Sequence, residues 1–249
     1  MIKKSWLKVT VNLTPLSAMQ TPEPISSAFV SEIAYVLDQS GSMGPMQEPA
    51  IAAFNDFIRS QLDVPGEARL TLVLFDDQYE VPVTSQSIEQ VKLLTAATYQ
   101  PRGSTALLDA IGRTVTELHA RIQAQPEAER PGKVIVAIFT DGHENASRTF
   151  TAAHISDLIR LYRNEKGWEF LFLAANQDAI ASAARMSIDA QMGGDVHFNE
   201  KGIKSSSAAM ARKVRASRMK SAGTMDEQAA CDDVMSLREI LAEEEAKPE

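Results

Sequence analysis

The segment IAYVLDQSGS, residues 33–42, joins an apolar run to a cluster of oxygen-bearing side chains. Its first five residues are apolar without alternation. A short run of this kind is typical of a strand that is buried on both faces, as strands in parallel sheets are. The run is followed by Asp38, Ser40 and Ser42. The segment therefore predicts a central strand that carries one carboxylate and two hydroxyl groups at its carboxyl end.

Three further apolar runs have this character, at residues 70–75, 134–139 and 170–175. Between the runs, apolar residues recur every three or four positions, as in amphipathic helices. These helical segments cover residues 51–62, 111–122, 155–162 and 179–185. Strands that alternate with helices predict an α/β fold with a doubly wound, mostly parallel sheet. Residues 79–83 alternate and contain Pro82, which predicts an antiparallel strand at an edge.

The composition indicates a folded protein. The apolar share of 44% and the charged share of 23% are ordinary for a globular chain of 249 residues, which excludes a mostly disordered or collagen-like protein. The net charge of −8 argues against nucleic-acid binding by the whole chain. The single cysteine, Cys231, excludes an internal disulfide. No apolar run has the length of a signal peptide or a membrane span, so we expect a soluble, cytoplasmic protein.

The chain divides into three parts by composition. Residues 1–28 contain an alternating segment, 7–13, and a proline-containing linker, so we expect a strand and a linker there. Residues 29–199 hold the apolar runs and form the expected main domain. Residues 200–249 form an expected charged, helical extension.

The extension changes its charge along its length. Residues 201–220 contain seven bases and no acid, whereas residues 226–249 contain nine acids and two bases. We expect a basic helix, a break near Gly223 and an acidic helix, with the charged faces turned to water.

Two more polar segments are expected near Asp38. Asp141 follows the apolar run 134–139 within the sequence Thr140-Asp141-Gly142, and Thr105 opens a predicted helix. Ligands of doubly wound sheets bind at the carboxyl ends of strands where the winding reverses, so neighbouring strands would bring these side chains together. Carboxylate and hydroxyl oxygens are hard ligands. They favour Mg²⁺ or Mn²⁺, and Ca²⁺ less.

Residue counts exclude several other sites. An EF-hand loop that began at Asp38 would require Gly at its sixth position and Glu at its twelfth, which are Met43 and Pro49. The G-x-S-x-G nucleophile elbow would require glycine in place of Asp38. The chain contains no P-loop and no H-E-x-x-H motif.

The segment Asp38-x-Ser40-x-Ser42, Thr105 and Thr140-Asp141-Gly142 together resemble the metal-ion-dependent adhesion site (MIDAS) of von Willebrand factor A domains. Their order and spacing match that pattern, and the resemblance covers residues 33–188. Residues 167–178 also resemble a branch of stand-alone bacterial and phage proteins with this domain, which implies a small cytoplasmic protein.

The resemblance implies a sheet of six strands, mostly parallel, with helices on both faces and a metal ion at its top. It implies that Ser40, Ser42 and Thr105 bind the ion through their hydroxyl groups. Asp38 and Asp141 would bind it directly or through water. A Glu or Asp from a partner protein would complete the coordination, and such sites switch between a closed, low-affinity form and an open one.

Several neighbouring residues have two interpretations each. Ser104 either supports the Thr105 loop or caps the helix, and Asp109 either orders the site through water or serves as a capping or solvent-facing residue. His143 and Glu144 either contact a partner or metal, or are polar loop residues.

Cys231 has no basic neighbour in the sequence that would activate its thiol, so we do not expect it to be reactive.

The leading functional hypothesis is a protein-binding module without enzymatic activity, because a full set of oxygen ligands occurs without a nucleophile or general base. One alternative is Mg²⁺-dependent phosphoryl transfer through an aspartyl-phosphate, for which Ser40 replaces the usual second acid. Another is nucleic-acid binding through residues 201–220. Related bacterial domains suggest an AAA-type ATPase as one possible partner, and no membrane partner is expected.

Overall fold

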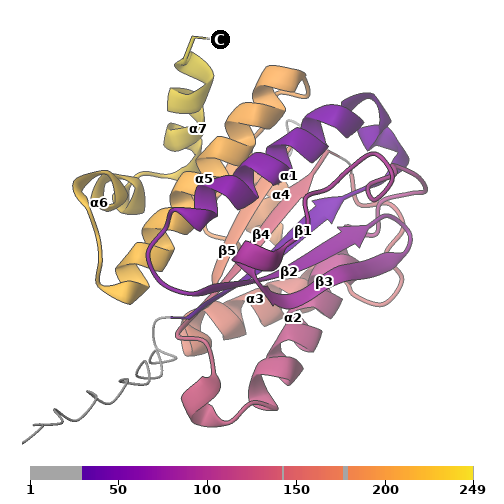
Figure 1. Cartoon of the computed structure of the whole chain (residues 1–249). Helices are drawn as coiled ribbons and strands as arrows, with labels where there is room; N and C mark the ends of the chain where they lie inside the picture. The colour runs from indigo at the N-terminus through magenta and orange to yellow at the C-terminus, as the bar shows by residue number, and fades with distance from the viewer. Residues whose placement is uncertain (1–29, 142, 176–178, 249) are drawn as a thin grey trace, which may run out of the picture.

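The computed structural model describes residues 30–141, 143–175 and 179–248 (Figure 1). The strand and linker expected within residues 1–28 lie outside this part of the chain. None of the helices in the described ranges is both long enough and apolar enough to cross a lipid bilayer.

Within the described residues, six strands form one sheet in the order β3-β2-β1-β4-β5-β6. All neighbouring strands are parallel except β3, which runs antiparallel to β2 at one edge. The predicted fold class, a mostly parallel sheet with one antiparallel edge strand, is therefore confirmed. The strands are β1 (Ser31–Asp38), β2 (Ala68–Phe75), β3 (Tyr79–Ser87), β4 (Lys133–Thr140), β5 (Glu169–Ala174) and β6 (Gly193–Asp195).

The central strand β1 explains why its apolar run shows no alternation. All eight of its residues are buried. Ile33 and Tyr35 pack into the core on one face of the sheet, and Ala34 and Val36 pack into a separate core on the other. Both faces of this strand are dry, so both sets of alternate residues are apolar.

Helices cover both faces of the sheet in the described part of the chain (Figure 1). The face of Ile33 is covered by α1 (Gln47–Leu62), α5 (Glu200–Ala222) and α7 (Leu237–Ala246). The opposite face is covered by α2 (Leu107–Gln123), α3 (Ala152–Lys166) and α4 (Ala179–Arg185). The remaining helices are short: α6 (Glu227–Val234), η2 (Gly41–Met46), η3 (Ile88–Gln90), η4 (Glu127–Glu129) and η5 (Ala190–Met192).

The winding of the chain reverses at β1. The next strand in sequence, β2, pairs with one side of β1, and β4 pairs with the other side. Leu37 is opposite Phe139 in the ladder, so Asp38 and Thr140 end their strands side by side. A crevice at such a reversal is the expected ligand site of a doubly wound sheet.

The loop between β4 and α3 is attached to the start of α2. The carboxylate of Asp109 accepts backbone hydrogen bonds from Arg148, Thr149 and Phe150, at 2.7–3.3 Å. These bonds lower the pKa of Asp109, although partial burial opposes them. They hold the loop that follows Asp141 against α2.

The edge strand β3 is irregular. Its pairing with β2 shifts register twice. Pro82 lies within it, and Ser85 has a positive φ of 44°. Pro82 lacks a backbone N–H and cannot donate a hydrogen bond to a neighbouring strand. Proline is therefore confined to edge strands, where one side of the strand has no neighbour.

The basic segment forms α5, and α5 ends at Gly223, which has a left-handed φ of 68°. The helix break expected near Gly223 is therefore confirmed. The expectation that its charged residues face water is wrong for Lys213 and Arg218, which are 5% and 2% exposed. Arg218 donates hydrogen bonds to the carbonyls of Gln61, Val64 and Gly66. The carbonyl of Gln61 lies in the last turn of α1, and those of Val64 and Gly66 lie in the segment after the helix, where no further helical turn supplies N–H donors.

The acidic segment forms two helices, α6 and α7, rather than one. Ser236 begins α7 with a capping box that involves Glu239. Arg212 on α5 forms ion pairs with Asp232, Glu243 and Glu244, which joins all three helices. The division of the chain at residue 200 stays a prediction.

Replacing the buried guanidinium of Arg218 tests whether α5 is an integral part of the fold. We expect Arg218→Met to lower the free energy of unfolding by about 3 kcal/mol, because four acceptor atoms lose a charged donor in a buried site. Lys220→Met is the matched control, since Lys220 is 61% exposed and forms a surface ion pair with Asp233, and it should cost less than about 1 kcal/mol. Urea unfolding measures both, and equal losses would contradict this role of Arg218.

The depressed pKa of Asp109 predicts a pH-dependent contribution to stability. The unfolded-state pKa is about 3.9, and the folded-state pKa is lower. The ionised carboxylate therefore stabilises the fold above the unfolded pKa, and this contribution is lost as the pH falls through the folded pKa. We expect Asp109→Asn to destabilise the protein at neutral pH and to match the wild type at pH values below the folded pKa. Urea titrations across this range measure the difference, and a difference independent of pH would contradict the assignment.

Candidate metal-ion site

The carboxylate of Asp38 lies at the carboxyl end of β1 and is fully buried. Its Oδ1 accepts a hydrogen bond of 2.7 Å from the backbone N–H of Ser40, and its Oδ2 accepts one from the hydroxyl of Thr140. Its carbonyl oxygen accepts a 2.6 Å bond from the hydroxyl of Tyr99. Asp38 is therefore held in one orientation by groups from three segments.

The two serines connect Asp38 to the other predicted carboxylate. The hydroxyl oxygens of Ser40 and Ser42 lie 3.0 Å apart, and the hydroxyl of Ser42 donates a 2.8 Å hydrogen bond to Oδ1 of Asp141. Ser40 is buried, whereas Ser42 is exposed and Asp141 is partly exposed. The row of oxygen atoms thus runs from the interior to the surface.

The loop that carries Thr105 is docked on both neighbouring segments. The backbone N–H of Gly41 donates to the carbonyl of Gly103 at 3.1 Å. Asn145, after β4, receives the N–H of Thr105 at its side-chain oxygen. Gly103 has a left-handed φ of 65°, which would strain a larger residue, and a Cβ there would lie 2.2 Å from a carboxylate oxygen of Asp77, which would have to move. Four of the predicted residues are thus linked by hydrogen bonds, Asp38 through the backbone N–H of Ser40 and the others through their side chains. The buried Thr105 lies on the adjacent loop.

The charges at this site are not balanced by a basic residue. No ion pair among the described residues includes Asp38 or Asp141. Burial raises the pKa of Asp38. Burial, together with the nearby charge of Asp38, raises the pKa of Asp141 to about 6, although the bond from Ser42 opposes this. A cation would favour the ionised form of both groups.

The donor set fits a hard divalent ion. In the described ranges, no cluster of three or more His, Cys, Asp or Glu side chains is placed to hold a metal. The candidate site instead combines two carboxylates with hydroxyl groups, and all of these donors are oxygen atoms, which Mg²⁺ and Mn²⁺ prefer over softer ligands.

Sequence reasoning missed the residues that support the site. Tyr99 and Asn145 act through hydrogen bonds between distant segments, which no local pattern indicates. Asp76, in the turn between β2 and β3, accepts the N–H of Gln78 at 2.6 Å. Asp76 also pairs with Arg102, which fixes the start of the Thr105 loop.

The residues with two interpretations are now placed. The carboxylate of Asp109 accepts hydrogen bonds from backbone N–H groups of the β4–α3 loop and so holds this loop against α2. Glu144 is a loop residue that caps α2, because its carboxylate accepts the N–H of Leu108 at 2.9 Å. Ser104 is exposed and lines a polar hollow with Asp109, and His143 lines a separate pocket.

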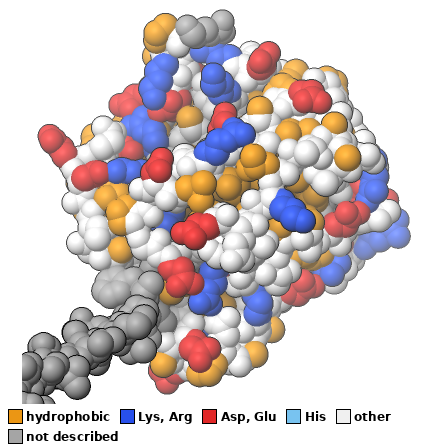
Figure 2. Space-filling view, viewed as in Figure 1, with side chains coloured by type: hydrophobic (Ala, Val, Ile, Leu, Met, Phe, Trp, Pro, Cys, Tyr) orange, Lys and Arg blue, Asp and Glu red, His pale blue; other side chains and the backbone are white. Residues whose placement is uncertain are grey.

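Five of the seven bases of the basic segment are engaged within the molecule, an outcome that weakens the nucleic-acid alternative. Three of these bases form ion pairs with acidic side chains of α6, of α7 and of the turn before α6. Two others donate hydrogen bonds to backbone carbonyl groups. These five residues are Arg212, Lys213, Arg215, Arg218 and Lys220. Figure 2 shows acidic and basic side chains intermixed over the C-terminal helices, at the upper left, rather than separated by sign.

Solved structures with this fold come from several organisms. Proximal thread matrix protein 1 from the mussel byssus matches with a TM-score of 0.52 and 17% identity, over 78% of this chain and 48% of that one. Another structure of that protein, with a zinc-occupied MIDAS motif, matches with a TM-score of 0.47 and 18% identity, over 68% and 42%. The open pilus adhesin SpaC of Lactobacillus rhamnosus GG matches with a TM-score of 0.55 and 12% identity, over 75% and 30%.

These likenesses, at such low identity, concern the fold alone. The chain spans less than half the length of the mussel protein structures that it matches. A search of curated proteins finds no significant match. The family model for the von Willebrand factor type A domain matches residues 32–226, which is most of the chain. The chain therefore belongs to the family of von Willebrand factor type A domains.

Proposed function

We propose that this chain is a protein-binding module that depends on a metal ion and has no enzymatic activity. Mg²⁺, or Mn²⁺ in its place, is held by the hydroxyls of Ser40, Ser42 and Thr105 and by the carboxylates of Asp38 and Asp141. An Asp or Glu of a partner protein completes the site. The carrying observation is the run of hydrogen bonds from Asp38 to the backbone N–H of Ser40, and from the Ser40 hydroxyl through that of Ser42 to Asp141, with no basic ion-pair partner for either acid among the described residues.

The burial of these acids supports a cation at this position. An ionised carboxylate that leaves water without a partner is strongly disfavoured, and the raised pKa values of Asp38 and Asp141 express that cost. A divalent ion balances both charges at once. When bound, the ion supplies a Lewis-acidic centre for an external carboxylate, because the neutral hydroxyls add no further negative charge.

The exposure of the site supports a macromolecular ligand. Ser42 is exposed and Asp141 partly so, whereas Asp38 and Ser40 form the buried end. A side chain that projects from another protein reaches the outer end without entering the core.

The phosphoryl-transfer alternative receives less support from the geometry. A nucleophilic aspartate needs a carboxylate oxygen that is free to attack phosphorus. Both oxygens of Asp38 instead accept hydrogen bonds, from Ser40 and Thr140. This arrangement suits a fixed ligand better than a nucleophile. An AAA-type ATPase partner, a bacterial or phage source and a cytoplasmic location stay predictions.

Metal binding is tested with Ser40→Ala combined with Ser42→Ala. We expect the wild type to bind MgCl₂ in isothermal titration calorimetry and the double variant to bind at least about tenfold more weakly, because two ligand oxygens are lost. Ser60→Ala on α1 is the control, since its hydroxyl donates to the carbonyl of Phe57, accepts from the side-chain amide of the adjacent Gln61 and lies outside the site. Equal Mg²⁺ affinity in all three proteins would contradict the proposed ligands.

Partner capture is tested with the immobilised chain and lysate of the source cells. We expect at least one protein to be retained by the wild type in Mg²⁺ and lost in EDTA. The Ser40/Ser42 double variant should lose the same protein while keeping the wild-type circular dichroism spectrum. Retention that is identical in all conditions would assign the interaction to another surface.

A further inference from the structure

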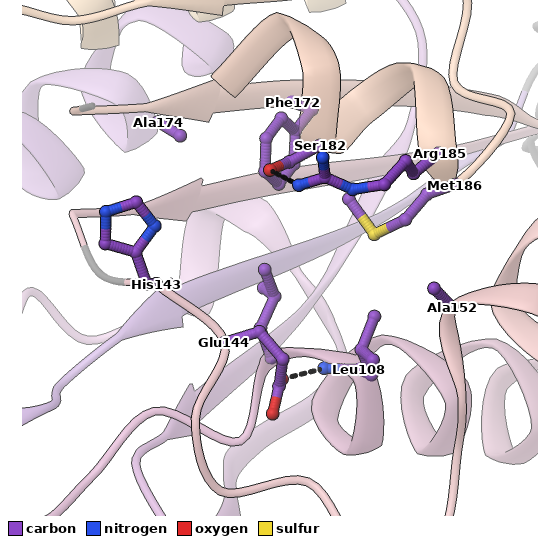
Figure 3. Close-up of a pocket in the computed structure, with 10 residues that line it drawn as sticks. Leu108, His143, Glu144, Ala152, Phe172, Ala174, Ser182, Arg185 and Met186 are labelled. Carbon is purple, nitrogen blue, oxygen red and sulfur yellow. Dashed lines mark hydrogen bonds between the residues drawn. The ribbon is translucent and has the colours of Figure 1, made fainter. Parts of the chain in front are cut away.

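A pocket of about 240 Å³ lies beside the candidate metal site, on the face covered by α2, α3 and α4 (Figure 3). Its inner wall is apolar and includes Leu107, Phe172 and Met186, all of them buried. His143 and Arg185 line it from opposite sides, as Figure 3 shows. The pocket therefore joins an apolar interior to a polar rim.

The volume of the pocket indicates the size of its ligand. It holds roughly the volume of eight water molecules at about 30 Å³ each. Sites for small molecules and cofactors usually measure about 300–1,000 Å³. The pocket is thus suited to one apolar side chain rather than to a cofactor.

The charges around the pocket favour an acidic ligand. The carboxylate of Glu144 is already saturated, since it accepts hydrogen bonds from the N–H groups of Leu108, Ala146 and Ser147 and from the Ser147 hydroxyl. Arg185 is exposed and donates only to the hydroxyl of Ser182, at 2.9 Å. Among the described residues it has no carboxylate partner, so a positive charge remains at the rim for a ligand to meet.

The pocket is within reach of a peptide bound at the metal site. His143 is two residues after Asp141, and two residues of chain span at most about 7 Å. The apolar wall includes Ala174 at the carboxyl end of β5, which neighbours β4. An extended ligand therefore needs only about two to four residues between the metal site and this pocket.

We propose that the pocket determines the specificity of the module by receiving an apolar side chain from an acidic segment of the partner. That side chain lies two to four residues from the acid that enters the metal site, and a second carboxylate of the same segment meets Arg185. This assignment rests on the proposed metal-dependent function, and it states which acidic segments the module selects.

The test selects random linear peptides, displayed on phage, against the immobilised full chain in Mg²⁺ and in EDTA. Ala152→Trp fills the pocket from its rim, since Ala152 lines it and is only partly buried. Ala153→Trp is the matched control, because Ala153 is the next residue of α3, is exposed and does not line the pocket. Arg185→Gln removes the rim charge, and Arg160→Gln removes an exposed charge of α3 that pairs with Asp157.

We expect the wild type and both controls to enrich acidic peptides in Mg²⁺ but not in EDTA. These peptides should carry Leu, Ile, Met or Phe close to one acid, on either side of it, and should contain a second acid. Ala152→Trp should enrich acids without the apolar preference, and Arg185→Gln should lose the second acid. A selected peptide should bind the wild type about tenfold more tightly than its version with Ala at the apolar position, and this ratio should approach one in Ala152→Trp.

The outcomes separate the two proposals. If acids are enriched in Mg²⁺ but the apolar preference is absent, or persists unchanged in Ala152→Trp, the role of the pocket is overturned and the metal-dependent function stands. If the wild type enriches no acidic peptide in a Mg²⁺-dependent way, both are overturned.

Discussion

The pairing of β1 with β4 is the constraint on which the candidate site depends. These two strands come from distant parts of the chain and lie side by side because the winding reverses at β1. Their last residues, Asp38 and Thr140, are thereby joined by a hydrogen bond. The Ser40–Ser42 turn and the Asp141 loop follow directly. Since both strands are buried on both faces, this position is fixed by the packing of two cores.

The parts that sequence predicts well are those encoded by local pattern. Runs such as residues 33–37 and 134–139 are apolar without alternation, and both are central strands. The edge position of β3 follows from its alternation and Pro82. The convergence of Asp38 and Asp141 was predictable from the rule for strand ends. The two acids are linked through the backbone N–H of Ser40 and the hydroxyls of Ser40 and Ser42.

The parts that sequence misses depend on distant partners. Arg218 belongs to a charge run that is normally a solvated face, yet it is buried, where its guanidinium donates to carbonyl groups at the end of α1 and in the segment after it. Glu144 is one acid among many in the sequence, and only its position above the start of α2 makes it a helix cap. The roles of Arg218 and Glu144 depend on which helix packs against each side chain, and the pattern of a single sequence does not show which helices pack together.

The irregularity of β3 has a consequence for association between molecules. A regular edge strand presents a row of unpaired N–H and C=O groups that can template pairing with a foreign strand. Pro82 removes one donor, and the two register shifts and the left-handed Ser85 interrupt the row. At the opposite edge, β6 has only three residues. Both edges of the described sheet therefore resist edge-to-edge pairing with a second molecule and the fibrous aggregation that such pairing starts.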